Sequence, residues 1–233
     1  MGGVIFFSGL GSSVLIIGFI VTAMTSALWW RDCIREGTLQ GHHTKKVRRG
    51  INIGFILFIV SEVFFFFSIF WAYFHSSLSP SVELGGIWPP MGIESLNIWE
   101  LPLLNTIILL SSGATVTTAH HGLIYKDRKI VILSLIATLI LAILFIACQG
   151  FEYYNAPFTF SDGAFGSTFF FSTGFHGIHV IVGTIFLMVA LYRVYNYELT
   201  DQHHVGFESA ILYWHFVDIV WLFLFISVYY WGS

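Results

Sequence analysis

Long apolar stretches separated by short polar connections make up most of this chain. A transmembrane helix needs about 20 apolar residues to cross roughly 30 Å of hydrocarbon. The stretches here are continuous, whereas the strands of a membrane barrel would alternate apolar and polar residues over about ten positions. The pattern therefore predicts an all-α, polytopic transmembrane helix bundle that forms a single membrane domain over residues 1–233. We expect about six spans, near residues 12–30, 51–74, 103–124, 130–151, 165–192 and 207–231.

The composition agrees with a membrane protein and argues against other classes. Charged residues are 10% of the 233, hydrophobic residues are 56%, and the mean hydropathy is +0.80. A soluble domain carries about 25% charged residues. The net charge of −3 offers no basic surface for nucleic acid, so we expect no nucleic-acid partner. Cys33 and Cys148 fall near opposite ends of the expected spans, much further apart than the ~7 Å between Cα atoms that a disulfide allows, which predicts free thiols.

The positive charges predict how the chain is oriented in the membrane. All Lys and Arg residues fall in the first, third and fifth connections between spans, and the second and fourth connections and the C-terminus have none. By the positive-inside rule, the odd-numbered connections face the matrix or cytoplasm. The C-terminus is then expected on the outer, intermembrane-space side.

Glu62 is the only charged residue in the apolar run 51–74. A charged side chain at the centre of a transmembrane helix costs about 2.5–3.5 kcal/mol on insertion scales. We therefore expect this carboxyl group to be neutralised, hydrated or paired. A structural interpretation is a protonated acid that is hydrogen-bonded to a neighbouring helix. The functional interpretations are a proton site or a contact with a lipid headgroup.

Histidines are the second group of polar residues inside the spans. His176 and His179 are separated by i,i+3 on the fifth span and His215 lies on the sixth, so these three could in principle gather at a metal. Adjacent histidines elsewhere in the chain point about 100° apart on a helix, and no Cys-x-x-Cys accompanies them. The pattern favours structural histidines and leaves metal ligation open. His215 and Asp218, also at i,i+3, are expected to satisfy each other.

Two further features concern the helix ends and the helix contacts. Basic residues at the inner end of the first span, Arg35 among them, can meet anionic phospholipid headgroups, although topology signalling explains their charge equally well. The run 111–114, Ser-Ser-Gly-Ala, would permit a close approach of helices. Neither feature specifies a function.

Longer strings with many polar positions are more specific than these features. In order along nearly the whole chain, they resemble cytochrome c oxidase subunit III, of the mitochondrial rather than the bacterial type. The strings are WWRDCIREGTLQGHHT (29–44), SEVFFFFSIFWAYFHSSLSP (61–80), LPLLNTIILLSSGATVTTAHHGL (101–123), FTFSDGAFGSTFF (158–170), TGFHGIHVIVG (173–183) and HHVGFESAILYWHFVDIVWLFLF (203–225).

The resemblance implies a non-redox accessory subunit of complex IV, in the respiratory chain of the mitochondrial inner membrane. Such a subunit binds no haem and no copper and packs with subunits I and II, which hold haem a and copper. It supports proton uptake and stability of the catalytic subunit during oxygen reduction, and it holds phospholipids in a cleft. Glu62 matches the family's buried, carbodiimide-reactive glutamate. The positions that resemble lipid contacts are Trp30, Arg35, Glu36, His43, Glu62 and Arg193.

One departure and two alternatives accompany this resemblance. The family has seven spans, and residues 2–7 look like the end of its first helix. We therefore expect that a separate polypeptide supplies that helix. Loss of the helix, or a start site upstream of Met1, would also explain the pattern. The first alternative function is subunit III of a bacterial quinol oxidase. The second is an independent membrane enzyme with a metal on His176, His179 and His215.

Overall fold

The computed structural model describes residues 2–9, 11–82 and 85–232 and is helical throughout its regular elements. The chain divides into two compact units, residues 1–50 and 51–233, which are described separately. The prediction of an all-α fold with six long apolar helices is confirmed. That these helices form one membrane domain stays a prediction.

The first unit contains a short helix and the first predicted span. Helix α1 (Gly2–Phe7) packs against α2 (Ser13–Thr38). A Cβ atom on Gly2 would lie only 2.7 Å from the Cα of Leu15, so glycine is what permits this contact. The chain turns between the two helices at Gly9 and Gly11, whose positive φ angles of 73° and 106° favour glycine.

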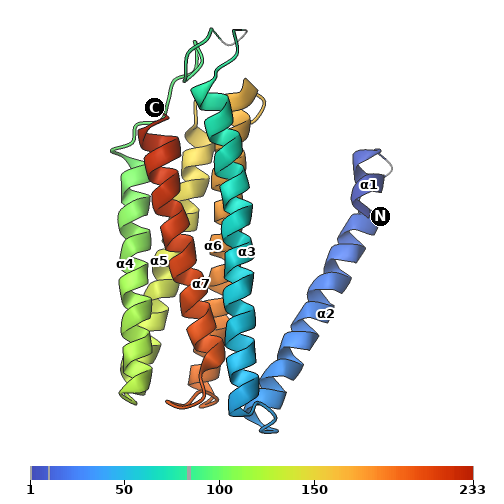
Figure 1. Cartoon of the computed structure of the whole chain (residues 1–233), viewed down its shortest axis with the longest axis vertical. Coiled ribbons are helices and arrows are strands. Elements are labelled where there is room, and N and C mark those ends of the chain that lie inside the picture. Colours follow the sequence, from blue (N-terminus) through green and yellow to red (C-terminus); the bar gives the residue numbers. More distant parts are fainter. Residues whose placement is uncertain (1, 10, 83–84, 233) are drawn as a thin grey trace. The chain divides into compact units, whose positions relative to one another are not determined.

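The remaining spans form a bundle in which helices that follow one another in the chain run antiparallel (Figure 1). Each helix begins or ends a few residues beyond its predicted span, because hydropathy marks the hydrocarbon core and not the helix ends at the headgroups. The last span finishes in a π-helix, η2. The elements are α3 (Lys45–Leu78), whose residues from Ile51 onward belong to this unit, α4 (Leu101–Ile124), α5 (Arg128–Asn155), α6 (Gly163–Tyr195), α7 (Val205–Leu224) and η2 (Phe225–Tyr230).

Within the bundle, the α4–α5 and α6–α7 connections lie at the same end, and the end of η2 lies at the other (Figure 1). This agrees with the predicted separation of basic and non-basic connections. Arg128 joins the two connections at the basic end. Its guanidinium donates to the backbone oxygen of Tyr195 at 2.6 Å and lies 3.7 Å from the centre of the Tyr197 ring.

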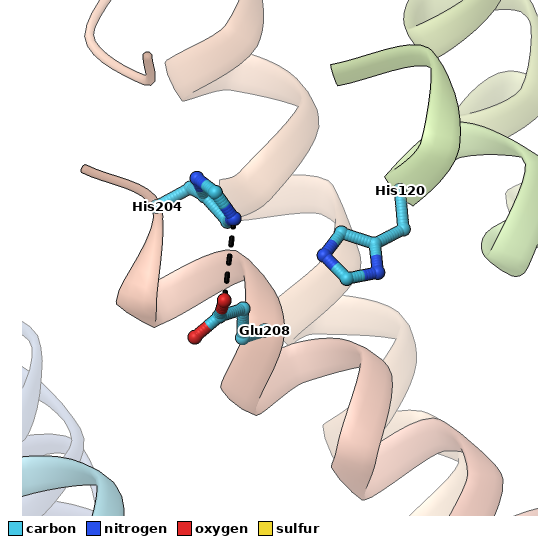
Figure 2. Close-up of side chains that lie close together, drawn as sticks. All are labelled: His120, His204 and Glu208. Atoms are coloured by element: carbon cyan, nitrogen blue, oxygen red, sulfur yellow. Dashed lines mark ion pairs between the residues drawn. The ribbon is translucent and has the colours of Figure 1, made fainter. Parts of the chain in front are cut away.

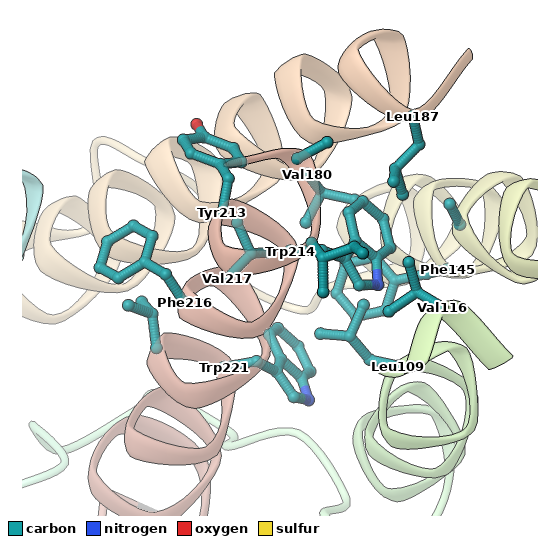
Figure 3. Packing of buried hydrophobic residues seen from close by; sticks show 14 of the residues in the cluster. Leu109, Val116, Phe145, Val180, Leu187, Tyr213, Trp214, Phe216, Val217 and Trp221 are labelled. Carbon is teal, nitrogen blue, oxygen red and sulfur yellow. The ribbon is translucent and has the colours of Figure 1, made fainter. Parts of the chain in front are cut away.

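Helix α7 is the most buried span, and its large aromatic side chains form the centre of the core (Figure 3). Trp214 and Trp221 are fully buried, and each indole N–H needs a partner because lipid offers none. The Trp214 indole donates to the Ser112 hydroxyl at 2.9 Å, and the Trp221 indole donates to the Thr106 hydroxyl at 3.0 Å. Two hydrogen bonds thus fix α7 against α4.

The predicted close approach of helices at the small residues of α4 is confirmed. Ser112 and Gly113 are buried, and a Cβ atom on Gly113 would lie 2.5 Å from a carboxylate oxygen of Asp218. Helices in lipid gain stability from tight packing and interhelical hydrogen bonds, since the tails are as apolar as the side chains. Cys33 and Cys148 are free thiols, as predicted.

Candidate functional site: a glutamate–histidine pair

Glu62 is paired with a histidine from another helix. In α3 its carboxylate oxygen Oε2 lies 2.8 Å from Nε2 of His179 in α6. The two side chains are 22% and 12% exposed, so the pair lies at the edge of the bundle and not at its centre. The sequence left three states open for this acid: neutralised, hydrated or paired. In the structure it is paired.

The opposite edge of the His179 ring shows which nitrogen carries a hydrogen. Nδ1 lies 2.7 Å from the backbone oxygen of Phe175, one helical turn earlier. A carbonyl oxygen can only accept, so Nδ1 is the donor in this contact. Nε2 therefore faces Glu62 either with a lone pair or, in the imidazolium form, with a second hydrogen.

These contacts determine the charge of the pair. A contact of 2.8 Å between Nε2 and Oε2 requires one proton between the two atoms. The proton can belong to the carboxyl group of Glu62 or to the ring of His179, and the pair is neutral overall in both cases. A neutral pair in which one proton has two possible positions removes most of the cost of an acid at this depth.

Aromatic rings surround His179 and hold its imidazole in place. The Phe66 ring meets it edge to face with centroids 4.9 Å apart, and the Tyr213 ring is stacked at 6.3 Å. Phe65 and Phe216 complete the frame. The frame comes from α3 and α7, so three helices position one proton-binding pair. Apolar surroundings also strengthen the electrostatic attraction inside it.

The alternative grouping of His176, His179 and His215 at a metal is wrong, because each ring has a different partner. The Nε2 of His176 donates to the backbone oxygen of Val217 at 3.2 Å and so joins α6 to α7. His215 lies 3.5 Å from Asp218, the predicted pairing, and 3.2 Å from the hydroxyl of Thr117. Among the described residues the group with metal-ligand spacing is a different one, which contains His120.

A further intramembrane acid, besides Glu62 and Asp218, is Glu152 in α5, which the sequence did not single out. Its side chain is only 2% exposed. Oε1 accepts hydrogen bonds from the Tyr229 hydroxyl at 2.6 Å and from the Gln149 amide at 2.9 Å. Gln149 in turn accepts from Asn105 of α4 at 3.3 Å. The network joins α4, α5 and η2. Its signal in the sequence is a polar cluster, Gln-x-x-Glu, just where the apolar run ends.

The positions predicted to contact lipid fall in both units. Trp30, Arg35 and Glu36 are exposed on the last turns of α2, and the His43 ring lies against Gly37 of the same unit. In the second unit, Arg193 lies roughly four turns further along α6 than His179, and its Nε is 3.4 Å from a carboxylate oxygen of Glu198. The structure therefore does not bring Glu62 and Arg193 together.

Comparison with known proteins decides the family. A family model described as Cytochrome c oxidase subunit III matches residues 1–233. The chain belongs to the cytochrome c oxidase subunit III family. Cytochrome c oxidase subunit 3 of Rhizopus stolonifer is 66% identical over 235 residues, which are 100% of this chain and 83% of that protein. The subunit 3 of Triticum aestivum is 59% identical over 236 residues, 100% of this chain and 89% of that protein.

Membership in the cytochrome c oxidase subunit III family confirms the main interpretation and not the two alternatives. The chain is a subunit of an oxidoreductase complex, complex IV of the respiratory chain. With six helices long and apolar enough to cross a bilayer, it is a multi-pass protein of the mitochondrial inner membrane.

Proposed function

We propose that this chain is a non-redox accessory subunit of cytochrome c oxidase. Haem a and copper belong to subunits I and II, its expected partners together with the other subunits of complex IV. This chain supports proton uptake by the catalytic subunit, stabilises it during oxygen reduction and binds phospholipids. Its C-terminus faces the intermembrane space. That a separate polypeptide supplies a first helix stays a prediction.

The Glu62–His179 pair carries this proposal. It places one proton between two titratable groups inside the membrane, and part of both side chains is exposed. A redox centre would need several ligand atoms around one point, whereas His176, His179 and His215 are each occupied by a different helix contact. The pair suits a site that holds or exchanges a proton next to lipid or a partner subunit.

Separation of this chain from the purified complex tests the non-redox role. We expect the haem absorbance and the copper to remain with the other subunits and the separated chain to be colourless. The measurement is a visible spectrum and a metal analysis of both fractions, with mass spectrometry to identify the subunits. Haem or copper recovered in stoichiometric amount with this chain would contradict the proposal.

The lipid contacts are proposed at Trp30, Arg35, Glu36, His43, Glu62 and Arg193. Arg35→Ala should weaken the binding of an anionic phospholipid about fivefold and so lower the phospholipid content of the purified complex, because a basic residue near an anionic headgroup contributes about 1 kcal/mol. Arg31→Ala is the matched control, since Arg31 lies on the same helix and its Nη2 is already 2.8 Å from Oδ1 of Asp32. Quantitative lipid mass spectrometry is the measurement. Equal lipid loss in both variants would count against a specific site at Arg35.

A further inference from the structure

Three side chains with metal-binding atoms gather at the basic end of the bundle. His120 lies one turn before the end of α4, His204 is the N-cap of α7, and Glu208 follows one turn later. One ligand atom from each lies within 4.8 Å of the others. Figure 2 shows the imidazole of His120 directed from α4 toward His204 and Glu208. These residues take no part in the Glu62–His179 pair.

The hydrogen bonds of His204 leave a position for a cation. Its Nδ1 lies 2.9 Å from the backbone oxygen of Thr200, which can only accept, so Nδ1 is the donor. Nε2 lies 3.2 Å from Oε1 of Glu208, and in the neutral ring it presents a lone pair to that oxygen. A lone pair and a carboxylate oxygen at this distance need a cation between them, which is a proton or a metal ion. A backbone carbonyl behind the ring is the usual outer partner of a metal-binding histidine.

His120 provides an independent observation. Its Nε2 atom is buried and has no hydrogen-bond partner among the residues that the structure describes. Leaving a buried polar atom unsatisfied costs about 1–3 kcal/mol. A metal ion between the three side chains would give this nitrogen a bonding partner. The ring is held edge to face against Phe207, which keeps it directed at α7.

The donor atoms indicate which ion fits. Two imidazole nitrogens and one carboxylate oxygen suit Zn²⁺, whereas Mg²⁺ and Ca²⁺ prefer oxygen ligands. Two ligands about 2.0–2.2 Å from a tetrahedral zinc ion are ~3.3–3.6 Å apart, so ligand atoms that now lie up to 4.8 Å apart must move closer by about 1 Å. Glu208 can make this movement because its side chain is 44% exposed. Water can occupy the fourth position of a tetrahedral site.

We propose that His120, His204 and Glu208 form a binding site for a divalent transition-metal ion, with Zn²⁺ as the preferred ion. The metal replaces the proton between His204 and Glu208, takes up the free nitrogen of His120 and joins the end of α4 to the start of α7. The inference rests on the geometry of the bundle and not on the proposed function. It differs from the expectation from the sequence that this chain has no metal ligands.

Uptake of isotopically labelled Zn²⁺ by the intact purified complex tests the proposal, since the label distinguishes added zinc from resident metals. The complex is equilibrated with labelled Zn²⁺, freed of excess by gel filtration and analysed by mass spectrometry. The site variant is His120→Asn with Glu208→Gln. The matched control is His121→Asn with His203→Asn, which changes the other member of each histidine pair.

We expect the wild type and the control to retain one more labelled zinc per complex than the site variant, whose Kd rises about tenfold or more. If the double variant does not assemble, Glu208→Gln alone is used, because 44% of this side chain is exposed. This single variant should also raise the Kd. Equal zinc retention by wild type and site variant, or no retention by the wild type, would overturn the proposal and leave a proton as the cation.

Discussion

Glu62 and Glu152 are both acids in transmembrane helices of one bundle, and their surroundings differ in two respects. Glu62 is half-buried and has one partner, His179, which can itself take up a proton. Glu152 is buried and accepts from Tyr229 and Gln149, neither of which gains a proton at ordinary pH. The first arrangement can exchange a proton with its surroundings, and the second fixes three elements together. Position inside the membrane therefore does not by itself identify a functional acid.

The largest effect is expected at the buried acid. Glu152→Ala removes the acceptor of Tyr229 and Gln149 and leaves a cavity, which should lower the free energy of unfolding by about 3 kcal/mol. Titration of the purified full chain with a denaturing detergent, followed by circular dichroism, measures this. Glu152→Gln is the control because it keeps the shape and one acceptor oxygen, so its cost should be about 1 kcal/mol. A loss below that of the Gln variant would mean that the network is not structural.

A smaller effect is expected at the half-buried pair. Glu62→Ala should cost about 1 kcal/mol, since interhelical hydrogen bonds in membranes contribute on this scale. Glu62→Gln should cost less, because the new amide can donate to Nε2 of a neutral His179, and the subunit should remain in the assembled complex. Proton uptake by the complex that carries Glu62→Gln should nevertheless be slower, because the amide cannot release a proton. The detergent titration measures the free energies of unfolding, the subunit content of the complex measures assembly, and the rate of proton uptake is measured on the assembled complex.

The Glu62→Gln variant can contradict the comparison between the two acids in two ways. If Glu62→Gln removed the whole subunit from the complex, Glu62 would be a structural residue like Glu152. If proton uptake were unchanged in a fully assembled Glu62→Gln complex, the pair would have no part in it.

The helices could be predicted from the sequence because each span satisfies its own backbone hydrogen bonds and shows this in its hydropathy. The pairing of His215 with Asp218 was also predictable, since i,i+3 residues are neighbours on one helix. That Glu62 needs an explanation could also be predicted, because it is the only charged residue in an apolar run. Each of these inferences uses information that is local in the chain.

The partner of Glu62 could not be predicted, because it is distant in the chain. Glu62 and His179 are 117 positions apart, and only the packing of α3 against α6 brings them together. Glu152 was overlooked because the predicted span stopped at residue 151, while the helix continues to Asn155. The histidine pairs were set aside because neighbours diverge on a helix, but one member of each of two pairs meets across α4 and α7.

Labelling with dicyclohexylcarbodiimide tests the difference between the two acids most directly, because this apolar reagent modifies protonated carboxyl groups that it can reach. The intact complex is labelled in its native membrane, and the adducts are mapped by peptide mass spectrometry. The account predicts an adduct on Glu62, which is 22% exposed and shares a proton, and none on Glu152, which is 2% exposed. An unlabelled Glu62, or equal labelling of Glu152, would contradict it.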